Sequence, residues 1–219
     1  MTPNTSAPAA PAAPTGAPSR ARGPVAVTLA ALAAAVVLPW LLPEQGYLLR
    51  ILCLITLFAA LAQAWNIAAG LSGLTSLGHA GFFGAGAYTS TLLLIHLGVT
   101  PWLGLIAAAA VGAVLAALLS WPTMRLRGHY FALATLAFGE VMRVIANSWK
   151  DLTGGPVGVS VPFSQPSLSA MQFQSLRPTF YLLLVALIVT CVVFERIRRG
   201  ALGLRQRALK NHPDAAASL

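Results

Sequence analysis

The sequence predicts an all-α fold: a polytopic helical membrane protein with about six transmembrane helices. Of its 219 residues, 57% are hydrophobic and only 9% are charged, whereas a soluble domain carries about 25% charged residues. The apolar residues gather in runs close to the roughly 20 residues that a helix needs to cross a bilayer. These runs do not alternate in polarity as the strands of a membrane barrel do. The composition therefore excludes an ordinary water-soluble enzyme, and it also excludes a disordered chain.

The first 24 residues are rich in Ala and Pro and contain no acidic residue. Such a segment buries too little apolar surface to offset its ordering entropy, so we expect a disordered cytoplasmic tail over residues 1–24. Arg20 and Arg22 precede an apolar run over residues 25–42. A cleaved signal peptide has the same order of features. The long leader and the lack of a small-residue cleavage site favour a retained first span.

Five further apolar runs predict the remaining spans. They cover residues 48–69, 80–97, 102–124, 130–149 and 179–194. Glycine and proline separate the runs, and Trp and Tyr side chains fall near several of their ends, where amphipathic rings favour the headgroup layer. We therefore expect a transmembrane domain over residues 25–194, followed by a cytoplasmic segment over residues 195–219.

The basic residues predict the orientation of the spans. With the N-terminus inside, ten of the 14 Lys and Arg residues are cytoplasmic, three are outside, and Arg143 lies within a span. Because positive charge concentrates on the cytoplasmic side, a cytoplasmic N-terminus is predicted. This topology accounts for the net charge of +9. We therefore expect a multi-pass membrane protein that contacts lipid and no nucleic acid.

The stretch over residues 70–86 reads GLSGLTSLGHAGFFGAG and has more glycine than a plain span needs. Irregular backbone at membrane depth is tolerated where it is buried in protein or lines a watery cavity. Close helix packing through small residues would also explain the glycines, and the sequence favours neither reading. His79 within this stretch suits either a hydrogen-bonded structural group or a functional one.

The fifth span carries Glu140 and Arg143, which are three residues apart and therefore neighbours on one helical face. Asn147 continues this face. Ionisable groups within a span face the bundle or a cavity because exposure to lipid is costly. The pair is either part of a solute pathway or a buried ion pair that fixes helix packing.

The outer segment between the fifth and sixth spans contains TGGPVG, over residues 153–158. It lacks the Lys and Ser/Thr that complete a phosphate-binding loop. The four histidines show no metal-ligand spacing, and the chain has no nucleophile-elbow motif. We therefore expect no catalytic, cofactor or metal site, and no enzymatic activity of the chain itself.

Four motifs in order resemble the LivM-type permease subunit of branched-chain amino acid ABC transporters. They are Asn66 followed by GLSGLTSLGHAGFFGAGAYTS, then RLRGHYFALATLAFGEVMR, the LTGG-x-x-G of residues 152–158, and ALGLRQRALKNHPDAAASL at the end. The resemblance covers most of the chain from Asn66 onward.

The resemblance implies roles for particular residues. A transport core would include Asn66, Gly78, His79, Gly81, Glu140 and Arg143. An outer loop motif would consist of Thr153, Gly154, Gly155 and Gly158. A segment contacting the ATPase would include Arg205, Arg207, Lys210, Asp214, Ala215 and Ala216.

The resemblance also implies partners and a solute. The partners would be a second, LivH-like permease, two ABC ATPase subunits that hydrolyse ATP, and a periplasmic binding protein. The solute would be leucine, isoleucine or valine. A related permease for urea or short amides, a secondary carrier and a non-transporting membrane anchor are the alternatives. Because family members continue into further spans, we expect this chain to be C-terminally truncated and not to transport by itself.

Overall fold

The computed structural model describes residues 23–43, 46–123, 126, 128–162 and 166–211, and only the backbone of residues 23–31, 207–209 and 211. Over these residues the regular elements are helices, together with one isolated antiparallel bridge between Ser167 and Gln172. The all-α prediction is confirmed. The chain divides after Leu41 into two compact units.

Helix α1 (Gly23–Leu41) is the described part of the first unit. It covers the first predicted span, and Pro39 lies in its last turn. Side chains are described from Leu32 onward, and the stretch Leu32–Leu41 is an apolar helix shorter than a span. The first span is therefore helical as predicted, and its crossing of a bilayer stays a prediction.

The second unit holds five helices that are long and apolar enough to cross a membrane among the residues that the structure describes. They are α2 (Tyr47–Ser72), α3 (His79–Leu97), α4 (Pro101–Thr123), α5 (His129–Ser148) and α7 (Leu176–Arg199). Three shorter helices complete it: α6 (Lys150–Thr153), the 3₁₀ turn η1 (Gly155–Val157) and α8 (Ala201–Asn211). Five of the six predicted spans are thus confirmed as membrane-length helices.

A left-handed glycine ends two of the five membrane-length helices. Gly73 follows α2 with a φ of 71°, and its N–H donates to Ala69 O at 3.1 Å. Gly98 follows α3 with a φ of 64°, and its N–H donates to Leu94 O at 3.1 Å. A left-handed residue after the last turn satisfies helix-end carbonyls, and glycine adopts that conformation without strain. For this reason α2 runs three residues past its predicted end.

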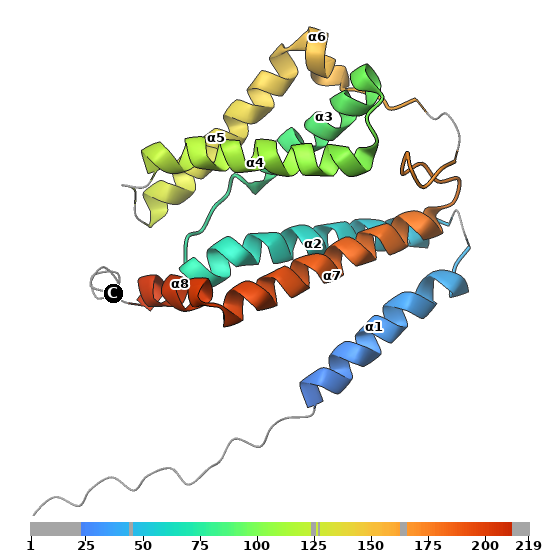
Figure 1. Cartoon of the computed structure of the whole chain (residues 1–219), viewed down its shortest axis with the longest axis horizontal. Coiled ribbons are helices and arrows are strands. Elements are labelled where there is room, and N and C mark those ends of the chain that lie inside the picture. Colours follow the sequence, from blue (N-terminus) through green and yellow to red (C-terminus); the bar gives the residue numbers. More distant parts are fainter. Residues whose placement is uncertain (1–22, 44–45, 124–125, 127, 163–165, 212–219) are drawn as a thin grey trace, which may run out of the picture. The chain divides into compact units, whose positions relative to one another are not determined.

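Helices α2 and α7 pack side by side along a continuous seam (Figure 1). The α2 side of the seam consists of buried residues spaced four, three and four apart: Leu49, Cys53, Thr56 and Ala60. Such spacing places them on one helical face. From α7, Phe180 and Leu184 are buried. Many larger apolar side chains of these helices, such as Phe58 and Val185, are exposed, as expected of surfaces that face lipid.

The two helices of this seam run parallel. The Cys53 thiol near the start of α2 lies 3.9 Å from Leu176 O at the start of α7. At the opposite end, α8 follows α7 and contacts the end of α2, where Lys210 Nζ donates to Gly70 O at 3.3 Å. Three membrane-length helices, α3, α4 and α5, lie between α2 and α7 in the sequence. After three crossings the chain enters α7 from the side at which α2 began, so the parallel arrangement fits the predicted topology. Helix α3 packs against α4 and α5 in a second group.

Candidate functional site: the groove between α3 and α5

A non-helical linker over residues 73–78 joins α2 to α3. The Trp65 indole N–H of α2 donates to Ser76 O at 2.7 Å. The Leu77 N–H donates to the Thr135 hydroxyl of α5 at 3.0 Å. These two bonds satisfy backbone groups that a break in a spanning helix would otherwise leave unpaired at great cost. The linker is therefore held from both sides, by α2 and by α5.

Thr135 is the buried anchor on the α5 side of this linker. Its side chain is 0% exposed. Its hydroxyl accepts from Leu77 N–H and donates to Ala132 O, one turn back, at 2.9 Å. One hydroxyl thus bonds both α5 and the linker.

The glycines that follow the linker bring α3 close to α5. A Cβ on Gly78 would overlap the backbone oxygen of Thr135, and a Cβ on Gly81 would lie 3.2 Å from Gly139 Cα. A Cβ on Gly84 would meet nothing within 4 Å. The glycine-rich stretch thus combines both predicted explanations: the helix is broken before His79, and the restarted helix packs closely through small residues.

Beyond the close contact, α3 and α5 diverge and enclose a groove of about 670 Å³. We call it the α3–α5 groove. Its α3 wall includes Gly81, Gly84 and Ala85, and its α5 wall includes Glu140 and Arg143. The remaining lining residues that matter here are Tyr88, Thr89, Val111, Leu136, Asn147, Leu152 and Thr153. The structure therefore brings the glycine-rich stretch and the charged face of the fifth span to one cavity.

Glu140 and Arg143 form a forked ion pair in this groove. Arg143 Nε donates to Glu140 Oε2 at 2.9 Å, and Arg143 Nη2 donates to Glu140 Oε1. The Arg143 and Glu140 side chains are 62% and 55% exposed, so the other helices among the described residues leave this pair uncovered. Glu140 lies about 16 Å along α5 from His129, at 1.5 Å per residue. A charged pair at such depth requires a polar or protein-filled neighbourhood.

Three residues of the predicted transport core do not line the groove: Asn66, Gly78 and His79. Asn66 is on α2, where its side chain contacts Gly70 one turn on. The His79 ring packs edge-on against Phe82 at 6.3 Å between centroids, and Phe82 packs on Phe138 at 4.9 Å. His79 Nδ1 is buried with no hydrogen-bond partner among the described residues. His79 thus lies in an aromatic cluster at the start of α3.

The predicted outer loop motif forms a cap on the end of α5. The buried Thr153 hydroxyl lies 2.5 Å from Ala146 O and 2.7 Å from Trp149 O. Gly154, with a φ of 71°, donates its N–H to Lys150 O at 3.0 Å. Gly155 and Gly158 also have positive φ, of 60° and 75°. The glycines serve a tight reversal, and Thr153 lines the groove at its end.

Three of the six residues of the predicted ATPase-contact segment lie on α8. Arg205 is exposed, and Lys210 contacts the end of α2 as described above. The side chain of Arg207 and all of Asp214, Ala215 and Ala216 lie outside the described residues.

Sequence reasoning missed Trp65, Ser76 and Thr135 as residues that hold the site. The only available signal was a hydroxyl within an apolar run. Other span threonines, such as Thr56 and Thr89, simply bond the carbonyl four residues back. The second partner of Thr135 is visible only in three dimensions.

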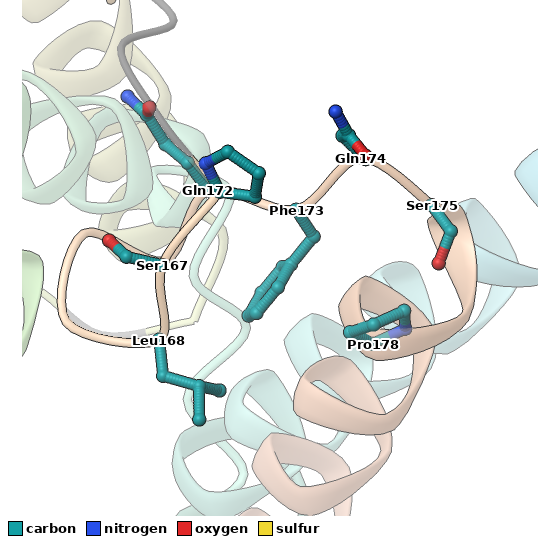
Figure 2. Close-up of a pocket in the computed structure, with 8 residues that line it drawn as sticks. Ser167, Leu168, Gln172, Phe173, Gln174, Ser175 and Pro178 are labelled. Carbon is teal, nitrogen blue, oxygen red and sulfur yellow. The ribbon is translucent and has the colours of Figure 1, made fainter.

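A second hollow of about 550 Å³ lies between the 167–172 turn and the start of α7 (Figure 2). Phe173 lies between the Ser167–Leu168 side and Pro178. Trp102 Nε1 of α4 donates to Leu168 O at 3.0 Å and ties the turn to the helix. The residues that line this second hollow are uncharged, so the α3–α5 groove is the better candidate for a charged or zwitterionic solute. Across the described residues, no three His, Cys, Asp or Glu side chains are grouped to hold a metal ion.

Comparisons with known proteins agree with the membrane-length helices. The family described as "Branched-chain amino acid transport system / permease component" matches residues 47–219. The high-affinity branched-chain amino acid transport system permease protein LivM of Salmonella typhimurium is 36% identical over 186 residues. The LivM protein of Escherichia coli is 34% identical over the same length. No solved structure gives a significant match.

Both alignments cover 74% of this chain but only 44% of the LivM proteins. The chain therefore spans less than half the length of these curated relatives. The family match includes all five membrane-length helices of the second unit. Together they make this a multi-pass protein of the inner membrane. The chain belongs to the permease-component family of branched-chain amino acid transport systems.

Proposed function

We propose that the chain is a permease subunit of an ATP-binding-cassette importer that moves leucine, isoleucine and valine across the inner membrane. The observation that carries this proposal is the α3–α5 groove, where an exposed ion pair lies beside walls of small apolar residues. The family match and the names of the LivM relatives support the transport role and the solute class.

The groove has the chemistry that a branched-chain amino acid requires. Such a solute carries a carboxylate, an ammonium group and an apolar side chain. In the proposed complex the carboxylate pairs with Arg143 and the ammonium with Glu140. The apolar side chain then lies along Gly84, Ala85 and Leu136. A cavity of about 670 Å³ is within the usual range of roughly 300–1,000 Å³ for small-molecule sites.

The existing ion pair suits a transient site. Arg143 and Glu140 satisfy each other while no solute is bound, so the groove holds no uncompensated charge. A zwitterion exchanges one charge-assisted pair for two, and its departure restores the original pair. Binding that is favourable but reversible is what a path through the membrane needs.

The exposed charges also imply that something polar covers this face. Lipid would make more than half-exposed charged side chains costly. In the proposal, α5 lines a path between this chain and a second, LivH-like permease. Two ABC ATPase subunits hydrolyse ATP, and a periplasmic binding protein delivers the solute. Alternating access of the two permeases then follows from motion of the ATPases.

The proposed orientation follows the distribution of basic residues. The N-terminal tail, the α2–α3 linker and α8 are cytoplasmic. The α5 cap, with Thr153 to Gly158, faces the periplasm. Helix α8 and the residues after it contact the ATPases. The parallel arrangement of α2 and α7 fits this orientation, since both then cross from the outside inward.

The test is uptake into proteoliposomes that contain the native permease complex including this chain. We expect uptake of labelled leucine that requires ATP, the ATPases and the binding protein. Uptake driven by an ion gradient without ATPases would contradict the proposal in favour of a secondary carrier. ATP-driven uptake of urea or acetamide but not leucine would contradict the proposed solute.

Variants of the ion pair test the groove itself. Arg143→Gln and Glu140→Gln should each reduce leucine uptake about tenfold or more, since a charge-assisted hydrogen bond contributes about 1.5–3 kcal/mol. Glu195→Gln is the matched control. Its carboxylate pairs with Arg198 at 2.7 Å with the same three-residue spacing, at the end of α7. Equal loss of uptake in the control variant would show that the groove has no special role.

A further inference from the structure

Lys210 joins α8 to the end of α2. Its Nζ donates to Gly70 O at 3.3 Å, across 140 positions of sequence. Its aliphatic stem covers Gly73, where Lys210 Cγ would lie 3.0 Å from an added Cβ. The side chain therefore makes a polar contact with the last turn of α2 and an apolar contact with the residue that ends it.

This contact is favourable for a clear physical reason. The last carbonyls of a helix lack partners within it and carry partial negative charge, which a lysine ammonium neutralises. At the end of α2, Gly73 N–H bonds Ala69 O, and Lys210 bonds Gly70 O. Loss of Lys210 would leave the last turn of α2 with one bond fewer immediately before the 73–78 linker.

At its other end α8 is held closely to α7. Gly200 N–H donates to Arg196 O at 3.0 Å and to Ile197 O at 3.1 Å in the turn between the two helices. A Cβ on Gly203 would lie 2.8 Å from Arg198 Cα and would overlap Ile197 O. Helix α8 therefore contacts the backbone of α7 near its start and α2 through Lys210 near its end. The position of α8 depends on both helices.

The linker continues this chain of contacts to the groove. It begins at Gly73, under the Lys210 stem, and its Leu77 N–H bonds Thr135. Thr135 lies on α5, five residues before Glu140, which lines the groove. The path from α8 to the groove therefore consists of the contacts made by Lys210 and Thr135, joined by the backbone of the linker and of α5.

We propose that Lys210 is a positioning residue that couples movement of α8 to the 73–78 linker, and through Thr135 to α5 and the groove. The inference rests on the proposed function, in which α8 lies at the ATPase contact. A displacement of α8 loosens the end of α2 and the linker, and the linker shifts α5 relative to α3. Lys210 touches neither solute nor nucleotide.

The experiment is hydrogen–deuterium exchange of the chain in phosphatidylethanolamine–phosphatidylglycerol nanodiscs. Lys210→Met keeps the stem over Gly73 but removes the donor. We expect amides of residues 71–78, including Leu77, to exchange about two- to fivefold faster, the ratio that a helix-end charge of this kind corresponds to. Lys210→Arg should restore slow exchange. Arg205→Met, on the same helix, is the control and should leave these amides unchanged.

Unchanged exchange over residues 71–78 in Lys210→Met, or equal acceleration in Arg205→Met, would overturn the inference. Gly203→Ala provides a second route, because its methyl group forces α8 away from α7 while Lys210 stays intact. It should accelerate exchange over the same residues, and no acceleration would also count against the coupling.

A functional readout separates coupling from stability. In the assembled complex, leucine uptake per ATP hydrolysed should fall several-fold in Lys210→Met and recover in Lys210→Arg. An unchanged ratio of uptake to hydrolysis in Lys210→Met would refute a positioning role. If the wild-type complex takes up no leucine, the proposed function fails, whereas the exchange experiment still decides whether Lys210 holds the linker.

Discussion

Gly81 and Gly84 offer a matched test of how α3 meets α5. Both lie inside α3, three residues apart. Replacing either by alanine gains up to about 1 kcal/mol of helix propensity. Only at Gly81 does the new methyl group meet a neighbouring backbone, 3.2 Å from Gly139 Cα, with Met142 Cγ at 3.4 Å. The propensity gain therefore cancels in the comparison, and the difference between the variants reports the helix contact.

The size of this difference follows from the geometry. A methyl group at 3.2 Å from a backbone carbon forces α3 and α5 apart by a few tenths of an ångström, because Gly139 Cα cannot rotate away as a side chain can. Overpacking of this kind costs about 1–3 kcal/mol. We therefore expect Gly81→Ala to be less stable than Gly84→Ala by about 1–3 kcal/mol. Gly84→Ala should match or exceed the wild type, since nothing lies within 4 Å of its added methyl group.

The measurement is reversible unfolding in mixed micelles, with SDS as denaturant and far-ultraviolet circular dichroism as the signal. The free energies of unfolding of the two variants are compared directly. Equal values, or a more stable Gly81→Ala, would refute the close contact between α3 and α5. A large loss in Gly84→Ala would instead show that another element covers the groove at this position.

Three further predictions concern the supports of the site. Thr135→Val should lower the free energy of unfolding by about 1–3 kcal/mol because it leaves the Leu77 N–H unpaired, and Thr135→Ser should retain most of the stability in the same unfolding assay. Gly154→Ala should cost about 1–3 kcal/mol, since a left-handed residue carrying a Cβ is strained; a midpoint within error of the wild type would contradict the cap. Trp102→Phe keeps an aromatic ring but removes the indole N–H that donates to Leu168 O, so amide exchange in the 167–172 turn should accelerate while that of the α3–α5 contact does not change.

Several features of the site could be predicted from local sequence. The Glu140–Arg143 pair follows from a spacing of three residues, because helix geometry places such residues side by side. The glycine-rich stretch could also be recognised in the sequence. The structure was needed to show that both of its interpretations, a broken helix and close helix packing, apply. Gly78 and Gly81 touch α5, Gly84 faces the groove, and Gly73 ends α2. Glycine content does not reveal what lies opposite each residue.

The exposed state of the ion pair could not be predicted. Burial depends on which helices pack over α5, and that information lies in residues distant in sequence. Asn66 and His79 show the same limit. They belong to the same sequence motif as Gly81, but they do not line the groove, because neighbours in sequence need not face the same cavity. Thr153 was expected in an outer loop motif, and its hydroxyl lies against the carbonyls of Ala146 and Trp149 at the end of α5.

The sequence by itself determined the class of this protein and the places of its membrane-length helices, and it predicts their orientation. Those properties depend on composition within short windows, because a bilayer responds to the apolar and charged content of each segment separately. Only the tertiary structure decided that Leu77 bonds Thr135, 58 positions away, and that Lys210 bonds Gly70, 140 positions away. Such contacts depend on how helices pack, and packing is the joint result of surfaces from several segments, which no single window contains.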